Sequence, residues 1–191
     1  MSGHGFHVHG PHDHEIEHAA HADPKGLAGQ LAVITAVLAT VGAMFSYMGG
    51  ATQANAGLYK NDAAIKKTEA ANQWALYQSK SNKQNLAELA QALVTEDKRA
   101  AYQKEAERYK EEKNGIREKA EALDKQSEAF ELKSAEQMHL HHRWAQATTA
   151  LQVSIALAAI ALLTRKRWME WATLALGMLG FGLGAAAALH V

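Results

Sequence analysis

Seven of the eleven histidines of this chain lie among its first 21 residues, and imidazole is a common protein ligand for zinc, nickel and copper. His14, His18 and His21 follow the i, i+4, i+7 spacing that would align them along one face of a helix. Glycines and Pro11 make the first part of this tail flexible, and its histidines lack zinc-finger spacing. Two interpretations therefore stay open: weak, adaptable binding of a divalent transition metal (Zn, Ni or Cu), or a polar tail without a physiological metal.

A second group of histidines, His139, His141 and His142, directly precedes Arg143 and Trp144. Basic and aromatic residues commonly mark the level of the lipid headgroups, so this cluster is typical of a membrane interface. A metal or proton site is the alternative. The sequence contains no Ser/His/Asp arrangement, phosphate-binding glycine loop or zincin motif. We therefore expect no enzymatic activity.

The charge balance and the residue types exclude several other classes of protein. Twenty acidic and twenty basic residues cancel, so nothing indicates a nucleic-acid partner. Cysteine is absent, which rules out disulfides, thiolate metal sites and cysteine nucleophiles. The two prolines, Pro11 and Pro24, lie in the tail, so no proline interrupts a helix from Lys25 onward.

Three stretches without charged residues are long enough to cross a membrane as helices: residues 27–48, 147–164 and 171–189. A helix rises about 1.5 Å per residue, so about 20 residues cover the roughly 30 Å hydrocarbon core of a bilayer. The stretches contain no ionisable side chain at depth, which disfavours a coupled transporter but leaves an oligomeric pore open. We therefore predict an integral membrane protein that has the lipid bilayer as a partner.

Residues 49–146, between the first and the second stretch, predict two long helices that form an antiparallel hairpin. This segment is rich in Ala, Glu, Lys, Gln and Leu, which are good helix formers. Both arms must begin at the same membrane face, so the turn should divide the segment into nearly equal lengths. A turn near residues 94–96, where Thr95 could cap the second helix, satisfies this condition. A turn at Asn114-Gly115 would give arms that differ about twofold in length.

A seven-residue repeat of large side chains runs along the second arm and predicts a coiled coil. Four positions after each large residue comes a mostly small one, such as Ala106 or Ala120, which suits closely approaching helices. The predicted seam residues of the second arm are Tyr102, Tyr109, Ile116, Leu123 and Phe130. The first arm has a weaker repeat with polar layers in its middle: Leu58, Ile65, Asn72, Ser79, Leu86 and Leu93.

The sequence therefore predicts an all-α membrane protein with three transmembrane helices and a long antiparallel coiled-coil helical hairpin between the first and the second. The predicted segments in chain order are a histidine-rich tail (1–26), a first transmembrane helix (27–48), an extramembrane hairpin (49–146), a second transmembrane helix (147–164), a basic loop (165–170) and a third transmembrane helix (171–189).

Small residues at every fourth position of the last stretch predict close helix packing. Gly180, Gly184 and Ala188 form a G-x-x-x-G-x-x-x-A face, which lets helix backbones approach closely in lipid. Small residues are common in any membrane helix, so such a face does not by itself require an interface. Together with the long hairpin, it favours self-association into a homo-oligomer.

Three segments of the chain, read together with its histidine-rich start, resemble a known family. They are EAANQWALYQSKS (69–81), EAERYKEEKNGI (105–116) and IALLTRKR (160–167). With these segments the chain resembles the uncharacterised bacterial family catalogued as domain of unknown function 4337. The resemblance implies a bacterial membrane protein of about this size. It supplies no activity, cofactor or catalytic residue.

The short Arg165-Lys166-Arg167 loop is the strongest positive-inside signal in the chain and should face the cytoplasm. Three spans then place the N-terminus in the cytoplasm and the hairpin on the periplasmic or extracytoplasmic side of a bacterial inner membrane. Basic residues at the ends of the hairpin, such as Lys60 and Lys133, point the other way. Long loops largely escape the rule, so we give the short loop more weight.

We expect a membrane protein of structural or interaction type, a homo-oligomeric scaffold whose coiled-coil hairpin projects as a stalk. The alternative is a metal-responsive membrane protein or oligomeric channel that uses the histidine-rich tail. A change in oligomer size or conductance on addition of a chelator would separate the two.

Overall fold

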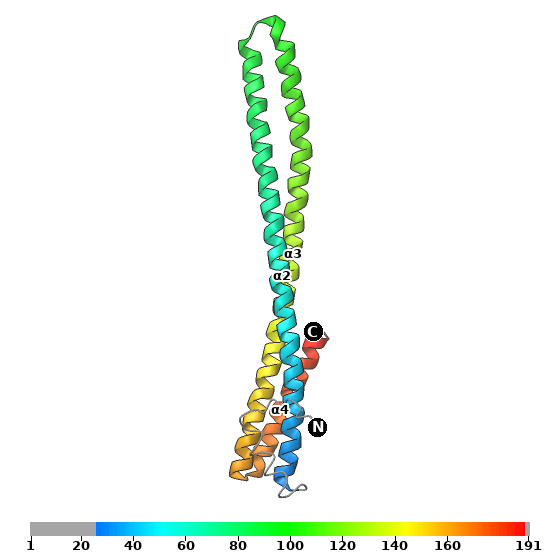
Figure 1. Cartoon of the computed structure of the whole chain (residues 1–191), viewed down its shortest axis with the longest axis vertical. Helices are drawn as coiled ribbons and strands as arrows, with labels where there is room; N and C mark the ends of the chain where they lie inside the picture. The colour runs from blue at the N-terminus through cyan, green and yellow to red at the C-terminus, as the bar shows by residue number, and fades with distance from the viewer. Residues whose placement is uncertain (1–25, 190–191) are drawn as a thin grey trace, which may run out of the picture. The chain divides into compact units, whose positions relative to one another are not determined.

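The computed structural model describes residues 26–189, which form three long helices and no strand (Figure 1). Helix α2 spans Leu27–Leu93, α3 spans Glu96–Thr164 and α4 spans Arg167–Ala188. Good helix formers dominate the polar parts of α2 and α3, and no proline occurs in any of the three helices. The prediction of an all-helical protein is therefore confirmed over the described residues.

All three helices are long and apolar enough to cross a membrane, by length and composition. The stretches predicted as spans lie in α2, α3 and α4, and the last of them ends one residue beyond α4. Helices α2 and α3 run without a break from their apolar stretches into the polar middle of the chain. Each of these two helices therefore contributes to both of the compact units into which the described residues divide.

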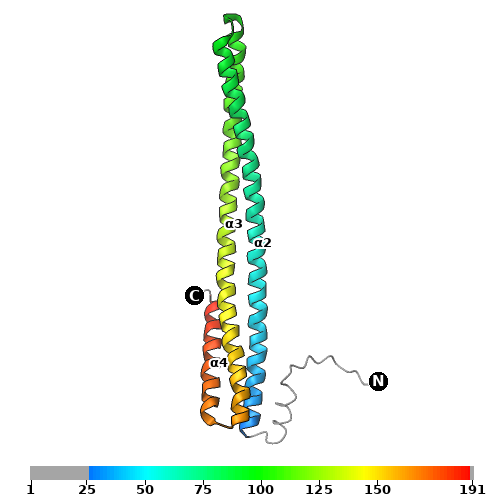
Figure 2. The ribbon, with the colours of Figure 1, turned by 90° about the vertical axis from the view of Figure 1, so that its left-hand side faces the viewer.

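The three-helix unit comprises residues 26–53 and 138–189, which are the start of α2, the end of α3 and the whole of α4 (Figure 2). Its core contains a buried cluster of Leu31, Ala158 and Ala161. The hydroxyl of the fully buried Ser154 donates a hydrogen bond to the carbonyl oxygen of Thr173 at 2.7 Å, which joins α3 to α4. Small residues let these backbones approach closely, so van der Waals packing and a few interhelical hydrogen bonds hold the three helices together.

The two-helix unit comprises residues 54–137, in which the polar parts of α2 and α3 lie side by side and antiparallel. The hydroxyl of Ser134 donates to the carbonyl oxygen of Ala56 at 2.9 Å, and that of Ser127 donates to the carbonyl oxygen of Ala63 at 3.0 Å. Ala56, Ala63 and Ala70 are buried at intervals of seven residues. These alanines let the two backbones come close enough for a short serine side chain to reach the opposite helix.

The reversal between α2 and α3 falls at Val94 and Thr95. The carbonyl oxygen of Thr95 accepts a hydrogen bond from the backbone N–H of Lys98 at 3.0 Å, in the first turn of α3. Glu96 and Asp97 also lie in that turn, where their negative charges stabilise the helix by interacting with the positive end of its dipole. Gly115 lies inside α3, and a Cβ added there would meet nothing within 4 Å.

The register predicted for the first arm was wrong. Leu58, Leu86 and Leu93 are 63%, 65% and 77% exposed, so their series does not face α3. The buried series begins two residues earlier, with Ala56 and Ala63. The smaller residue is favoured at this contact because the serine–carbonyl hydrogen bonds require a short distance between the backbones.

Candidate functional site

The three histidines predicted as metal ligands, His14, His18 and His21, lie outside the described residues. Within residues 26–189, no group of three or more His, Cys, Asp or Glu side chains is placed so that it could hold a metal ion. In the second histidine group, Nδ1 of His141 lies 2.9 Å from the carbonyl oxygen of Gly49, while His142 is exposed.

The seam residues predicted for the second arm are all half-buried in the two-helix unit: Tyr102, Tyr109, Ile116, Leu123 and Phe130. The ring of Phe130 stacks on that of Tyr59 from α2, with centroids 6.4 Å apart. The hydroxyl of Tyr109 donates to a carboxylate oxygen of Glu105 at 3.0 Å. The large side chains thus lie beside the smaller, more deeply buried residues and do not form a wide apolar core.

A polar layer in the middle of the two-helix unit is centred on Asp124. One carboxylate oxygen accepts a hydrogen bond from Nζ of Lys67 at 2.8 Å, and the other accepts one from Nε1 of Trp74 at 2.8 Å. The bond from Lys67, followed by that from Trp74, lowers the pKa of Asp124 below its ordinary value. The same ion pair raises the pKa of Lys67. This layer joins α2 to α3 by one ion pair and one hydrogen bond.

A second polar layer lies closer to the turn and joins Lys80 of α2 to Glu112 of α3. The hydrogen bond from Lys80 lowers the pKa of Glu112. Next to it, Nζ of Lys113 donates to the hydroxyl of Ser81 at 3.4 Å. Both charged pairs lie beside the seam and are partly exposed, so they join the two helices without burying apolar surface.

The small-residue face of α4 packs inside the three-helix unit. Gly180 and Gly184 are buried, and a Cβ at Gly184 would collide with the ring of Phe45 from α2. A Cβ at Gly180 would lie 2.7 Å from Cδ2 of Leu151 in α3. The third predicted member, Ala188, is exposed, and the neighbouring Ala187 takes the buried position instead. The two glycines thus contact their own chain, because both neighbouring helices cross α4 at this face.

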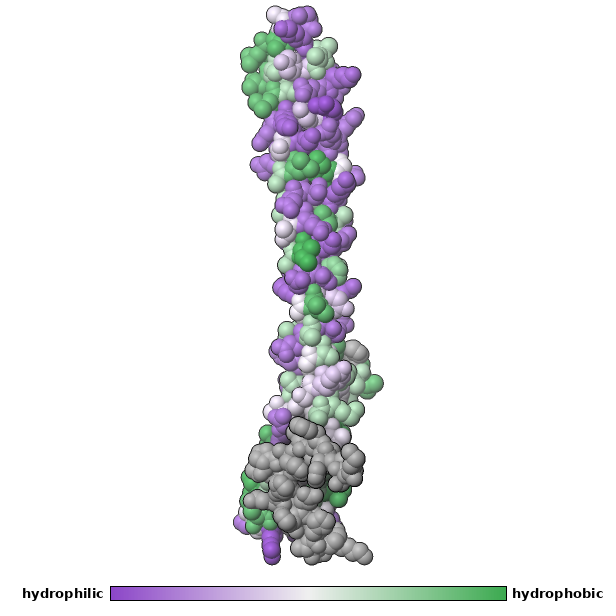
Figure 3. All heavy atoms as spheres, in the orientation of Figure 1, coloured by the Kyte–Doolittle hydropathy of each residue, from purple (hydrophilic) through white to green (hydrophobic). Residues whose placement is uncertain are grey.

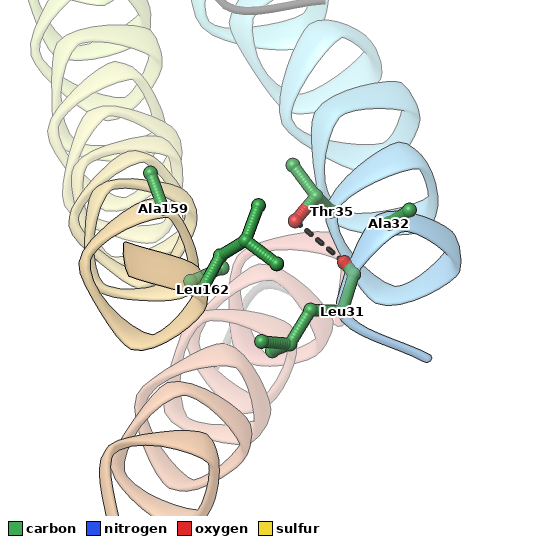
Figure 4. A pocket seen from close by; sticks show the side chains of 6 residues that line it. Leu31, Ala32, Thr35, Ala159 and Leu162 are labelled. Carbon is green, nitrogen blue, oxygen red and sulfur yellow. Dashed lines mark hydrogen bonds between the residues drawn. The ribbon is translucent and has the colours of Figure 1, made fainter. Parts of the chain in front are cut away.

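Two hollows, one in each unit, lie among the described residues. A crevice of about 10 Å³ lies between α2 and α3 of the three-helix unit and has room for at most one water molecule (Figure 4). Its polar group, the hydroxyl of Thr35, already donates to the carbonyl oxygen of Leu31 at 2.7 Å. An open groove of about 350 Å³ lies near the turn of the two-helix unit. It is lined by Lys83, Leu86, Ala87, Ala90, Tyr102, Glu105 and Tyr109.

Apolar side chains also lie on the surface of the two-helix unit, among polar ones (Figure 3). The first-arm series that was predicted to face α3 supplies four of them at multiples of seven residues. We call these four the outer series: Leu58, Ile65, Leu86 and Leu93. Leu86 also lines the open groove.

Comparison with known families gives a match over nearly all of the described chain. The family described as Domain of unknown function (DUF4337) matches residues 27–190. The chain belongs to this family. No curated protein and no solved structure gives a match.

The DUF4337 match contains α2, α3 and α4 entire and begins after the last histidine of the tail. The candidate metal ligands therefore lie outside the part that defines the family, while both polar layers lie inside it.

The Asp124 layer was not predicted from the sequence, although the spacing of its α2 residues indicates it. Lys67 and Trp74 are seven residues apart, so a helix places them on the same face of this DUF4337 chain.

Proposed function

We propose that this DUF4337 protein is a non-enzymatic integral membrane protein that acts as a homo-oligomeric scaffold. In this proposal the three apolar helices cross the membrane, and the polar parts of α2 and α3 form a coiled-coil hairpin that carries contacts between copies. The main support for the proposal is the outer series. Its large apolar side chains lie exposed in a polar segment, and their heptad spacing suits contact with a further helix.

The membrane assignment is supported by the composition of the helices. The stretches 27–48, 147–164 and 171–189 contain no charged side chain, and each could span a bilayer. The exposed side chains of the three-helix unit include Val37, Met44 and Met178, which would face lipid acyl chains in a bilayer. Such side chains would be a liability in water, since large exposed apolar surfaces promote aggregation.

The coiled-coil assignment is supported by the contacts between α2 and α3. Small buried residues recur every seven positions on α2, and half-buried large residues recur every seven on α3. The Asp124 and Glu112 layers cross between the helices at intermediate positions. Polar layers of this kind commonly set the register of a coiled coil at some cost in stability.

Self-association is supported by the spacing of the outer series. Leu58 and Ile65 are seven residues apart, as are Leu86 and Leu93, and Asn72 lies in the same register between them. This pattern is what a further helix would pack against, with the asparagine specifying register. The open groove beside Leu86 could receive a side chain from a second copy.

The test of self-association is the double substitution Leu86→Gln/Leu93→Gln. Burial of a leucine contributes about 1.5–3 kcal/mol, so losing two should weaken association more than about 100-fold. The mass of the full-length protein in mild detergent, measured by light scattering after size-exclusion chromatography, should fall from an oligomer to a monomer.

The matched control is Leu132→Gln, which makes the same change at an exposed position of α3. It should leave the mass unchanged. Both variants should keep their helical circular dichroism, because none of the three leucine side chains is buried within the chain. A wild-type protein that is already monomeric would overturn the scaffold proposal.

We also propose that the protein lies in a bacterial inner membrane with its N-terminus in the cytoplasm and the turn of the two-helix unit outside. The chain has no cysteine, so a single one can report on each side. Glu96→Cys, at an exposed position, should react with a membrane-impermeant thiol reagent in intact cells or spheroplasts. Ser2→Cys should react only after lysis, and the reverse pattern would place the hairpin in the cytoplasm.

A further inference from the structure

The turn between α3 and α4 carries three consecutive basic residues, Arg165, Lys166 and Arg167, and all three are exposed. Of the ion pairs found within residues 26–189, none includes any of them. Arg165 adopts a left-handed backbone conformation, with φ of 51°, which reverses the chain within two residues (Figures 1 and 2). The reversal concentrates three positive charges in one short turn; Glu170 lies in the first turn of α4, and no ion pair joins it to them in the described part of the chain.

Two exposed indoles follow directly on α4. Trp168 is 65% exposed and Trp171 is 72% exposed, and their spacing of three residues puts them on one side of the helix. Met178, seven residues after Trp171, is also exposed on that side. The cations therefore mark the start of an apolar strip along α4. Indoles are amphipathic and favour the headgroup level of a bilayer, between water and hydrocarbon.

We propose that this turn binds the headgroup of an anionic phospholipid. Its phosphodiester accepts charge-assisted hydrogen bonds from the guanidinium and ammonium groups of residues 165–167, and an acyl chain lies along Trp168, Trp171 and Met178. Charge complementarity selects an anionic headgroup, and the adjoining apolar strip selects a lipid over a free phosphate. The inference rests on the proposed membrane insertion and deepens it by naming a lipid class and its contact residues.

The test uses full-length protein purified in a neutral detergent. It is titrated with dioleoylphosphatidylglycerol, dioleoylphosphatidylcholine or sodium phosphate, and lipid binding is followed by native mass spectrometry. The turn variant is Arg165→Gln/Lys166→Gln/Arg167→Gln. The matched control, Lys104→Gln/Lys110→Gln/Lys125→Gln, removes the same charge from exposed lysines of the two-helix unit.

We expect the wild type to bind the phosphatidylglycerol more tightly than the phosphatidylcholine. Each basic residue at an anionic surface contributes roughly a factor of five, so the turn variant should lose on the order of 100-fold in affinity for phosphatidylglycerol. The control variant should keep the wild-type affinity. Equal affinity of the wild type for both lipids, or an equal loss in both variants, would overturn the proposal.

Two further arms make the result decisive. Sodium phosphate that displaces phosphatidylglycerol at equal phosphate concentration would indicate a free-phosphate site and contradict the lipid assignment. If the turn variant does not fold, the affinity of the wild type for phosphatidylglycerol is measured at increasing salt concentration instead. This affinity should fall as salt is added, and an affinity independent of salt would refute the proposal.

Alkaline carbonate extraction of membranes separates this inference from the proposed function. Release of the wild type by carbonate would contradict membrane insertion itself. A protein that resists extraction yet shows no preference for phosphatidylglycerol would leave the proposed function standing and refute the lipid site alone.

Discussion

The substitution Gly180→Ala should lower the free energy of unfolding by about 1–3 kcal/mol, although it adds one methyl group to a helix. In most helices this change is stabilising, because alanine has the higher helix propensity. Here the new Cβ would lie 2.7 Å from Cδ2 of Leu151 and 3.2 Å from its backbone nitrogen. Leu151 is fully buried, so neither the side chain nor the α3 backbone can move away without disturbing the three-helix unit.

The control lies two residues further along the same helix. Gly182 is exposed, and a Cβ added there meets nothing within 4 Å. Gly182→Ala should therefore leave stability unchanged or raise it by up to about 1 kcal/mol. Thermal unfolding of both variants in the same detergent, followed by circular dichroism at 222 nm, gives the comparison. If Gly180→Ala proves as stable as Gly182→Ala, α4 does not pack on α3 through this face.

Loss of the Asp124 carboxylate should destabilise the two-helix unit in a way that depends on pH. The pKa of Asp124 lies below its ordinary value of 3.8, because the carboxylate is hydrogen-bonded by Lys67 and then by Trp74. A carboxyl group of this kind stabilises the folded state above its unfolded pKa, and the stabilisation disappears as pH falls through the folded pKa. Asp124→Asn should thus lower the melting temperature at pH 7, and the difference from wild type should shrink below about pH 4.

A second substitution separates the hydrogen bond of Trp74 from the charge of Asp124. Asparagine can still accept a hydrogen bond from the indole N–H of Trp74, whereas alanine cannot, so Asp124→Ala should have a lower melting temperature than Asp124→Asn. The control is Glu131→Gln, which breaks an exposed ion pair with Lys60 and should change little. A wild-type–variant difference that is the same at pH 7 and pH 2 would show that the Lys67–Asp124 pair is not formed.

Much of the secondary structure follows from local properties of the chain. The apolar stretches, the long helix-forming middle and the absence of proline after Pro24 predict three long helices, and the structure has them. The reversal at Val94 and Thr95 was predicted from arm length and from the acidic residues that follow it. Gly115 stays inside α3 because one glycine costs only about 1 kcal/mol in a long helix.

The contacts between helices could be predicted only in part. The seam residues of the second arm, from Tyr102 to Phe130, are half-buried, but the first-arm series was placed on the wrong side. Gly180, Gly184 and Ala188 were predicted as a close-packing face between copies; in the structure the two glycines lie against Leu151 and Phe45 of the same chain, and Ala188 is exposed.

The sequence by itself determined that the chain forms long helices and which stretches of them are apolar. These properties depend on each residue and its near neighbours, through helix propensity and hydropathy. Only the tertiary structure decided which side of α2 meets α3. Ala56 and Leu58 both begin seven-residue series, and two residues are about 200° apart around a helix, so the two series lie on nearly opposite faces. Either could have been the seam, and the close backbone approach that joins Ser127 to Ala63 selects the alanines and leaves the leucines exposed.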